Sequence, residues 1–194
     1  MIGIEINANQ LTALRKACGE AKKSFAKELA AGINATTKAT RTQISKDIRS
    51  VVAMKKKDVD AKLKITSKAT AQNPVGHVVL EAGRREGLQY YDARQDKRGV
   101  SYKIKPGGGR SRVNGSFMGP TPGVLAPKLN GGVFKRAGST RLPIVKLYGV
   151  SAIGAWLKND FTADTIGFIS KGLEKQMERR IKLNVLRANG LVSK

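Results

Sequence analysis

The sequence is poor in the residues that most catalytic and metal sites use. It has one cysteine, Cys18, and one histidine, His77, among 194 residues. A single cysteine excludes a disulfide within the chain and gives no sign of an oxidising compartment. Zinc sites of the Cys/His type are excluded too, and a Ser-His-Asp triad would have to be built around His77. We therefore predict no metal site and no cofactor.

The other polar residues form no catalytic pattern. Ser101 and Ser116 lack the flanking residues of a nucleophile elbow. Asp58 and Asp60 lie in a lysine-rich turn, where salt bridges are the simpler explanation. We interpret His77 as a structural residue, because no Cys, Asp or Glu cluster accompanies it. We predict that the protein is not an enzyme, and an enzyme acting on an acidic substrate is the least favoured hypothesis.

Long apolar runs are absent as well. No stretch approaches the roughly 18 apolar residues of a membrane helix, and the first residues lack the basic and apolar regions of a signal peptide. Aromatic residues make up only 5% of the chain, which suits a modest core. We expect a single domain of residues 1–194, made in the cytoplasm and without a membrane partner.

Negative charge is scarce, and positive charge is abundant. The chain has 37 Lys and Arg against 14 Asp and Glu, a formal charge of +23, which implies a polyanionic partner. No carboxylate occurs from Lys97 through Asn159. A basic surface that only keeps the protein in solution is the open alternative. The cations that we predict to face DNA are Lys97, Arg98, Lys103, Lys105, Arg110 and Arg112.

Apolar residues at intervals of three and four predict two long helices. The first runs from about residue 10 to 52, with Asn9 as its N-cap and the stretch ATTKAT as its least helical part. The second runs from about 162 to 189, with Thr162 as its N-cap. A short helical turn built on Val59 and Leu63 follows the first helix. The residues that we predict to be buried are Leu14, Phe25, Leu29, Ile166, Leu173 and Met177.

The middle of the chain, residues 75–148, is predicted to be rich in strands. Strand signals occur at 75–83, which includes His77, and at 99–105, 132–136 and 144–147. Residues 106–127 are so rich in Gly, Pro and Ser that we expect a flexible arm without regular structure. The fold class is therefore α+β, with two long helices packed on a small, mainly antiparallel sheet. The aromatic residues that could stack on bases are Tyr102, Phe117 and Phe134.

The order of these features resembles a known family. An Ala- and Thr-rich helix through LAAGINATTKATRTQISKDI leads into VAMKKKDVDAKLKI and the basic middle. GSFMGP, GGVFKRAGSTRLPIVKLYGVSA and a final helix ending KQMERRIKLNVLRANG follow. In this order the chain resembles the prophage minor tail protein Z family, the tail completion proteins of long-tailed phages. The most specific segment is 132–151, with the motif residues Val133, Phe134, Arg136, Arg141, Leu142, Pro143 and Ile144.

The resemblance implies a virion structural protein. It would be added late to the head-proximal end of a non-contractile tail, while the virion is assembled in the host cytoplasm. The resemblance also implies a homo-oligomeric ring, six-fold like the tail, at the neck beside tail terminator, tail tube and head-completion proteins. It offers no catalytic residues. A subunit of charge +23 repeated around a ring would line the passage of genomic DNA without reading its sequence. The alternative is a nonspecific nucleic-acid-binding protein unrelated to virions.

Overall fold

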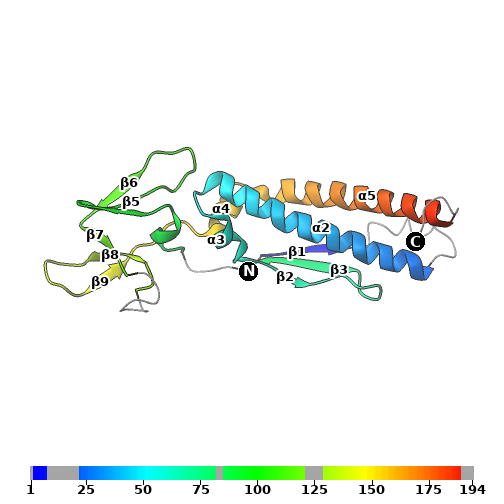
Figure 1. The fold of residues 1–194 in the computed structure, drawn as a ribbon, viewed down its shortest axis with the longest axis horizontal. Helices are drawn as coiled ribbons and strands as arrows, with labels where there is room; N and C mark the ends of the chain where they lie inside the picture. Colours follow the sequence, from blue (N-terminus) through cyan, green and yellow to red (C-terminus); the bar gives the residue numbers. More distant parts are fainter. Residues whose placement is uncertain (1, 8–21, 82–84, 121–128, 189–194) are drawn as a thin grey trace. The chain divides into compact units, whose positions relative to one another are not determined.

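The computed structural model describes residues 2–7, 22–81, 85–120 and 129–188. They form an α+β fold with two long helices and three small antiparallel sheets, as predicted (Figure 1). The chain divides into two compact units, whereas its length alone predicts one domain. Unit 1 comprises Met1–Ile44, Leu63–Glu81 and Asp160–Lys194, and unit 2 comprises Ser45–Lys62 and Ala82–Asn159.

Two long helices dominate unit 1. Helix α2 spans Lys22–Val51, its last residues belonging to unit 2, and helix α5 spans Phe161–Ala188. The two predicted helices are thus confirmed where the chain is described. Residues 8–21, with the predicted N-cap Asn9 and the predicted core residue Leu14, lie outside the described part. The predicted cap Thr162 is wrong, because α5 has already begun at Phe161.

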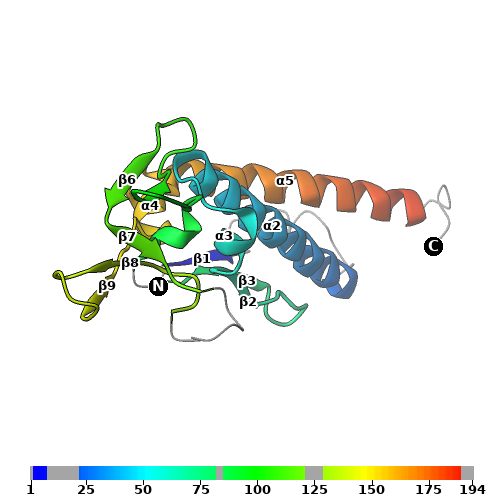
Figure 2. The ribbon, with the colours of Figure 1, turned by 60° about the vertical axis from the view of Figure 1, so that its left-hand side comes forward.

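The core of unit 1 joins the apolar stripes of the two helices, which are drawn next to each other in Figure 1 and diverge toward the right in Figure 2. Phe25 and Leu29 of α2 pack with Leu173 and Met177 of α5, and all four are buried, as predicted. The prediction for Ile166 is wrong, since 57% of this residue is exposed. On α5 the buried cluster begins only at Leu173, about two turns later, because periodicity marks the face of a helix and not the part of its length that a partner covers.

A three-stranded antiparallel sheet completes unit 1. Strands β1 (Ile2–Asn7), β2 (Leu63–Ser67) and β3 (Val75–Leu80) are arranged in the order β1-β3-β2. Strand β3 contains His77, as predicted. The predicted helical turn is correct only at Val59, which lies in α3 (Lys56–Asp60), a helix of unit 2. Leu63 instead begins β2, where it pairs with Leu80.

The Thr-rich part of α2 is regular helix, within the predicted range, and two of its three threonines bond to the helix backbone. The Thr37 hydroxyl donates to the Ile33 carbonyl at 2.7 Å, and Thr36 makes the same bond one residue earlier. Strand β3 approaches α2 closely at this point. A Cβ on Gly76 would lie 2.5 Å from the Thr37 hydroxyl oxygen, so only glycine fits there.

Unit 2 contains two small antiparallel sheets, drawn in green and yellow in Figure 1. The first has the order β4 (Arg94–Asp96), β5 (Gly99–Tyr102), β6 (Ser111–Asn114). The second has the order β7 (Ser116–Met118), β8 (Val133–Arg136), β9 (Ile144–Lys146). The strands predicted at 99–105, 132–136 and 144–147 are confirmed as β5, β8 and β9, each slightly shorter than predicted.

The prediction of an arm without regular structure at 106–127 is wrong over part of its length. Strands β6 and β7 lie within it, separated by Gly115, whose φ of +69° makes the turn. Val113 pairs with Val100, and Phe117 pairs with Phe134. These strands depend on partners outside the segment, so the local Gly and Pro content does not reveal them. Residues 121–128 lie outside the described part.

The core of unit 2 is assembled from short elements. Val100 of β5, Val133 of β8 and Trp156 of α4 (Ala152–Lys158) are fully buried. So is Tyr91, which follows a short 3-10 helix, η2 (Leu88–Tyr90), and whose hydroxyl donates to the Val150 carbonyl. Burial raises the pKa of the Tyr91 hydroxyl, with a further contribution from the Glu86 charge. No helix within the described residues has the length and apolarity needed to cross a membrane.

Candidate nucleic-acid interface

The sheet β4-β5-β6 of unit 2 carries or adjoins all six cations predicted to face DNA. Lys97 and Arg98 form the turn between β4 and β5, and both are exposed. The turn is held by Asp96, whose Oδ1 accepts from the backbone N–H groups of Arg98 at 2.8 Å and Gly99 at 3.0 Å. A carboxylate of this geometry fixes a tight turn and leaves the two basic side chains at its tip.

Lys103 and Lys105 follow β5. The strand ends at Tyr102, and the Lys103 backbone N–H then donates to the Tyr91 carbonyl at 2.9 Å. The Lys103 side chain is half-buried and that of Lys105 is exposed. The two lysines are therefore placed by backbone bonds that do not involve their ammonium groups.

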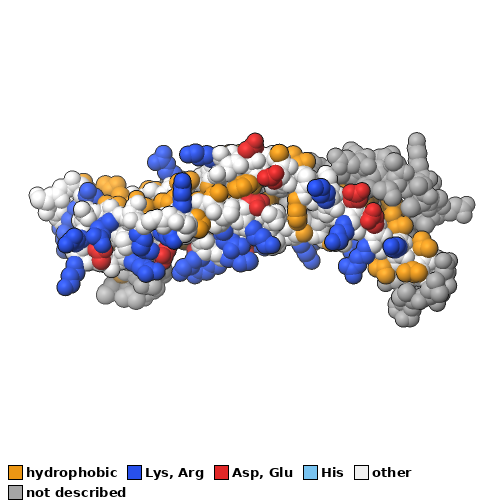
Figure 3. All heavy atoms as spheres, turned by 90° about the horizontal axis from the view of Figure 1, so that it is seen from above, with side chains coloured by type: hydrophobic (Ala, Val, Ile, Leu, Met, Phe, Trp, Pro, Cys, Tyr) orange, Lys and Arg blue, Asp and Glu red, His pale blue; other side chains and the backbone are white. Residues whose placement is uncertain are grey.

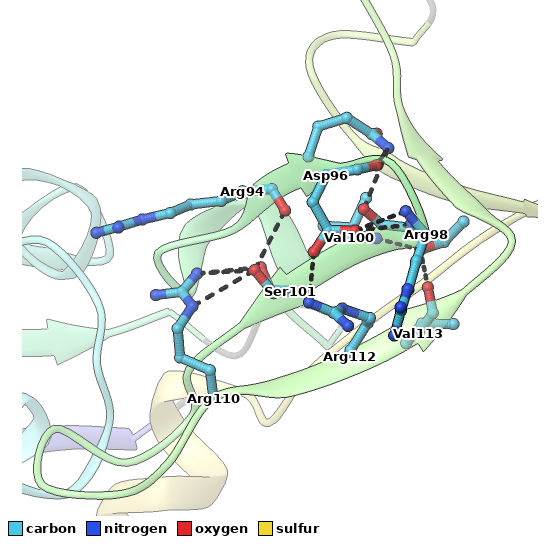
Figure 4. Close-up of polar contacts among 11 residues, drawn as sticks. Arg94, Asp96, Arg98, Val100, Ser101, Arg110, Arg112 and Val113 are labelled. Carbon is cyan, nitrogen blue, oxygen red and sulfur yellow. Dashed lines mark hydrogen bonds and ion pairs between the residues drawn. The ribbon is translucent and has the colours of Figure 1, made fainter.

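Arg110 is a structural residue in this sheet. Its guanidinium donates to a carboxylate oxygen and to the backbone carbonyl of Asp92, each at 2.5 Å, and to the Ser101 carbonyl at 3.2 Å. Asp92 has a φ of +48°, a conformation that aspartate adopts more readily than most residues. Figure 4 shows the Arg110 guanidinium reaching across to Ser101 of β5. Arg110 thus ties β6 to β5 and to the turn before β4.

Arg112 is paired as well. Its Nη2 lies 2.8 Å from Oδ2 of Asp96, the residue that holds the β4–β5 turn (Figure 4). The backbone N–H of Arg98, followed by the charge of Arg112, lowers the pKa of the Asp96 carboxyl. The Arg110 hydrogen bond, followed by the Arg94 charge, lowers the pKa of the Asp92 carboxyl. Each acid is therefore held ionised, and each neutralises one arginine of the predicted set.

The ion pairs separate the six predicted cations into two groups, two that are paired and four that are not. Within residues 85–120, Lys97, Arg98, Lys103 and Lys105 make no ion pair, and we call them the four unpaired cations. Arg112 lies in β6 and Arg110 directly precedes it, and the guanidinium groups of both bond to other parts of the sheet. Sequence reasoning does not single out Asp92 and Asp96, which stand just before the acid-free stretch. The pattern DARQDKRG, with an aspartate before a Lys-Arg-Gly turn, is the signal that could have identified the second of them.

Two of the three aromatic residues predicted to stack on bases, Phe117 and Phe134, make ring contacts within the protein. The rings of Phe117 and Phe134 stack on each other with centroids 6.0 Å apart, and Phe134 is only 6% exposed. The Arg136 guanidinium covers the Phe117 ring at 5.6 Å. Tyr102 is half-buried. Phe134 is thus unavailable to a base, and the interface must act mainly through charge.

The surface of the molecule agrees with this electrostatic character. On the face drawn in Figure 3, Lys and Arg side chains are spread widely and acidic side chains are few. Two of the acids and serines considered as catalytic candidates have structural bonds: Asp60 accepts from Ser45 at 2.6 Å, and the buried Ser116 hydroxyl bonds to the backbone of Val100 and Val113. Over the described ranges, no three His, Cys, Asp or Glu side chains gather as a possible metal site.

The comparisons with known proteins returned nothing: no family model, no curated protein and no solved structure matches the chain. The resemblance to tail completion proteins therefore depends on the order of sequence features and on residues 132–151. In the structure this segment forms β8, the tip at 137–143, β9 and the approach to α4.

Proposed function

We propose that the chain is a structural protein of a phage virion, a tail completion protein that acts at the neck where tail and head join. The observation that carries the proposal is the segment 132–151, whose sequence resembles the minor tail protein Z family. The α+β fold with two long helices is compatible with that family. The charge of +23 suits a subunit that stands close to packaged DNA.

The proposed assembly is a ring, six-fold by inheritance from the tail, in contact with tail terminator, tail tube and head-completion proteins. Its inner surface would carry the four unpaired cations of each subunit, so that DNA meets lysine and arginine without base readout. We assign no catalytic step to the protein.

Deletion in the phage or prophage that encodes the chain tests this function. We expect filled heads and finished tails that fail to join, visible by negative-stain electron microscopy, and joining restored by the purified protein. Normal virions from the deletion strain would contradict the proposal. If the protein bound nucleic acid in that case, the nonspecific nucleic-acid-binding alternative would replace it.

The DNA contact is tested separately. Replacing the four unpaired cations with Gln should flatten the dependence of log affinity on log salt, by about 0.9 for each phosphate that the variant no longer neutralises. Arg110 and Arg112 are left in place because they hold the sheet. A control that replaces four exposed cations of α5 (Lys171, Lys175, Arg179 and Lys182) removes the same charge and should keep most of the slope. An equal change in both variants would show that only net charge matters.

A further inference from the structure

Exposed apolar side chains concentrate on one short segment of unit 2. Eight large hydrophobic residues are exposed in the described part of the chain, and four of them lie within residues 142–150. They are Leu142 at 66%, Val145 at 53%, Tyr148 at 50% and Val150 at 42% exposure. We call residues 142–150 the β9 strip. Four exposed apolar side chains within nine residues, outside the sheet β4-β5-β6, make this segment a candidate for contact with another protein.

The β9 strip also has an open backbone edge. Strand β9 is the last strand of its sheet, and among the described residues it pairs with β8 alone, while Tyr148 beyond its end bridges Gly87. Leu147 donates to the Val133 carbonyl at 2.8 Å, and Val145 pairs with Lys135 in the same register. Backbone groups in an antiparallel pair alternate in direction, so those of Ile144 and Lys146 point away from β8. The edge can therefore accept another strand at these two residues.

Charge decides which kind of chain fits this edge. Every charged residue in the segment 132–151 is a cation: Lys135, Arg136, Arg141 and Lys146. The Lys146 ammonium lies 5.7 Å from the centre of the Tyr148 ring, within the strip itself. Lysine on an edge strand disfavours pairing with a second copy of the same edge, which would bring its own cations. An acidic chain meets no such repulsion.

We propose that the β9 strip docks an extended, acidic segment of a second protein, which adds a strand to the edge of β9. Val145 and Lys146 face opposite sides of the sheet, so the incoming strand should alternate. Its apolar residues would cover Val145, and its carboxylates would lie beside Lys146 and Arg136. This inference deepens the proposed function by giving the chemistry of a neck partner, and it depends on that function only for where the partner is found.

The test uses the full chain and three synthetic peptides of about nine residues with blocked ends. The first alternates Glu with Val, the second alternates Lys with Val, and the third is the Glu/Val peptide with N-methylated backbone amides. We expect the first peptide alone to bind. Backbone NMR signals of Ile144 and Lys146 should shift on binding, because their amide groups pair with the peptide. Equal binding of all three peptides, or shifts confined to other strands, would overturn the proposal.

Variants sharpen the test. Lys146→Glu should weaken binding of the Glu/Val peptide by about tenfold and strengthen binding of the Lys/Val peptide. Lys158→Glu, an equal charge change at the end of α4, should leave both affinities as they are. Equal effects of the two substitutions would overturn the proposal. A dimer of the wild-type chain in sedimentation velocity that Lys146→Glu abolishes would also overturn it, because the occupant would then be a second copy.

The outcomes separate this inference from the proposed function. If deletion leaves head–tail joining intact while the Glu/Val peptide binds at β9, the tail function fails and the docking site stands. If deletion blocks joining but the Lys146→Glu protein restores it fully and the peptide does not bind, the tail function stands and the docking site fails.

Discussion

The two units of the molecule are stabilised in different ways. Unit 1 depends on two long helices whose apolar stripes meet in one cluster around Leu29 and Met177. Unit 2 depends on short strands and turns, in which polar side chains bind the backbone of neighbouring strands. Ser116, for example, accepts from the Val100 N–H at 3.0 Å and donates to the Val113 carbonyl at 2.6 Å. The stability of unit 1 should therefore be most sensitive to a loss of side-chain volume. The stability of unit 2 should be most sensitive to poorer packing and to missing hydrogen bonds.

The difference between the helical unit 1 and the strand-rich unit 2 also explains where the candidate sites lie. A helix presents its side chains along a continuous surface, whereas short strands expose turns, edges and loop cations at close spacing. The four unpaired cations and the β9 strip both belong to unit 2. In unit 1, by contrast, Arg180 and Glu28 form an ion pair between the two long helices, with a contact of 2.7 Å.

The largest expected effect is the loss of core volume in unit 1. Leu173→Ala should lower the free energy of unfolding by about 2 to 5 kcal/mol, because it leaves a cavity beside Phe25 and Leu29. Denaturant unfolding measures the loss, and hydrogen exchange should show faster opening of α2 and α5. Ile166→Ala on the same helix is the control, and should cost no more than about 0.5 kcal/mol because that residue is exposed. Equal costs would refute the assigned core.

The next effect concerns close packing in unit 2. A Cβ on Gly149 would lie 2.6 Å from the ring of Tyr91, which is fully buried and anchored through its hydroxyl. Gly149→Ala should therefore cost about 1 to 3 kcal/mol through overpacking, as measured by denaturant unfolding. Gly138→Ala, at an exposed position with open space around it, is the matched change. A Gly149→Ala protein as stable as the Gly138→Ala protein would show that Tyr91 is free to move.

Helix periodicity made most of unit 1 predictable, and its failures are informative. Phe25, Leu29, Leu173 and Met177 were identified because a buried helix face repeats with a fixed period. The same period also predicts a buried Ile166, which is wrong because the period continues past the contact between the helices. Strand β2 was missed because its five residues gain their structure from β3, and no local pattern reports that pairing.

The candidate interface was predictable only in outline. An acid-free stretch identifies where positive charge accumulates, but it does not distinguish a cation that meets solvent from one that bonds across strands. Arg110 and Arg112 are cations of the same acid-free stretch as Lys97, yet they form ion pairs with Asp92 and Asp96, respectively. The exposed edge of β9 could not be predicted either, because an edge is defined by the order of strands in the sheet.

A smaller effect is expected from the polar link between the two sheets of unit 2. Ser116→Ala should cost roughly 1 to 2 kcal/mol, because the buried Val100 N–H loses its acceptor. Ser139→Ala, in the exposed tip at 137–143, should be close to neutral. Denaturant unfolding compares the two, and hydrogen exchange at Val100 gives a local measurement. If exchange there were unchanged in the Ser116→Ala protein, the hydroxyl would not be the acceptor.

The smallest effect is a dependence of stability on pH that originates in unit 2. The pKa values of Asp92 and Asp96 are lowered in the folded protein by the Arg110 hydrogen bond and by the Arg98 N–H, respectively. An aspartate in the unfolded chain has a pKa of about 3.9. The stabilisation by the two carboxylates is therefore complete above that value and is lost as the pH falls through the lower folded pKa values. Both side chains are partly exposed, Asp92 by 43% and Asp96 by 34%, so salt should reduce the effect.

Thermal unfolding from pH 6 to pH 2 measures this dependence, and a double-mutant cycle assigns it. Asp92→Asn keeps the side-chain shape and tolerates the positive φ of that position, so it should flatten the acid branch of the stability curve without unfolding the sheet. Arg110→Gln removes the cause of the lowered pKa and should flatten the same branch. Because the two residues act as one pair, the double variant should show little more flattening than Asp92→Asn alone. Additive flattening would mean that Arg110 affects stability in acid through other groups. The ion pair between Arg110 and Asp92, which sets Arg110 apart from the four unpaired cations, would then not be maintained in solution.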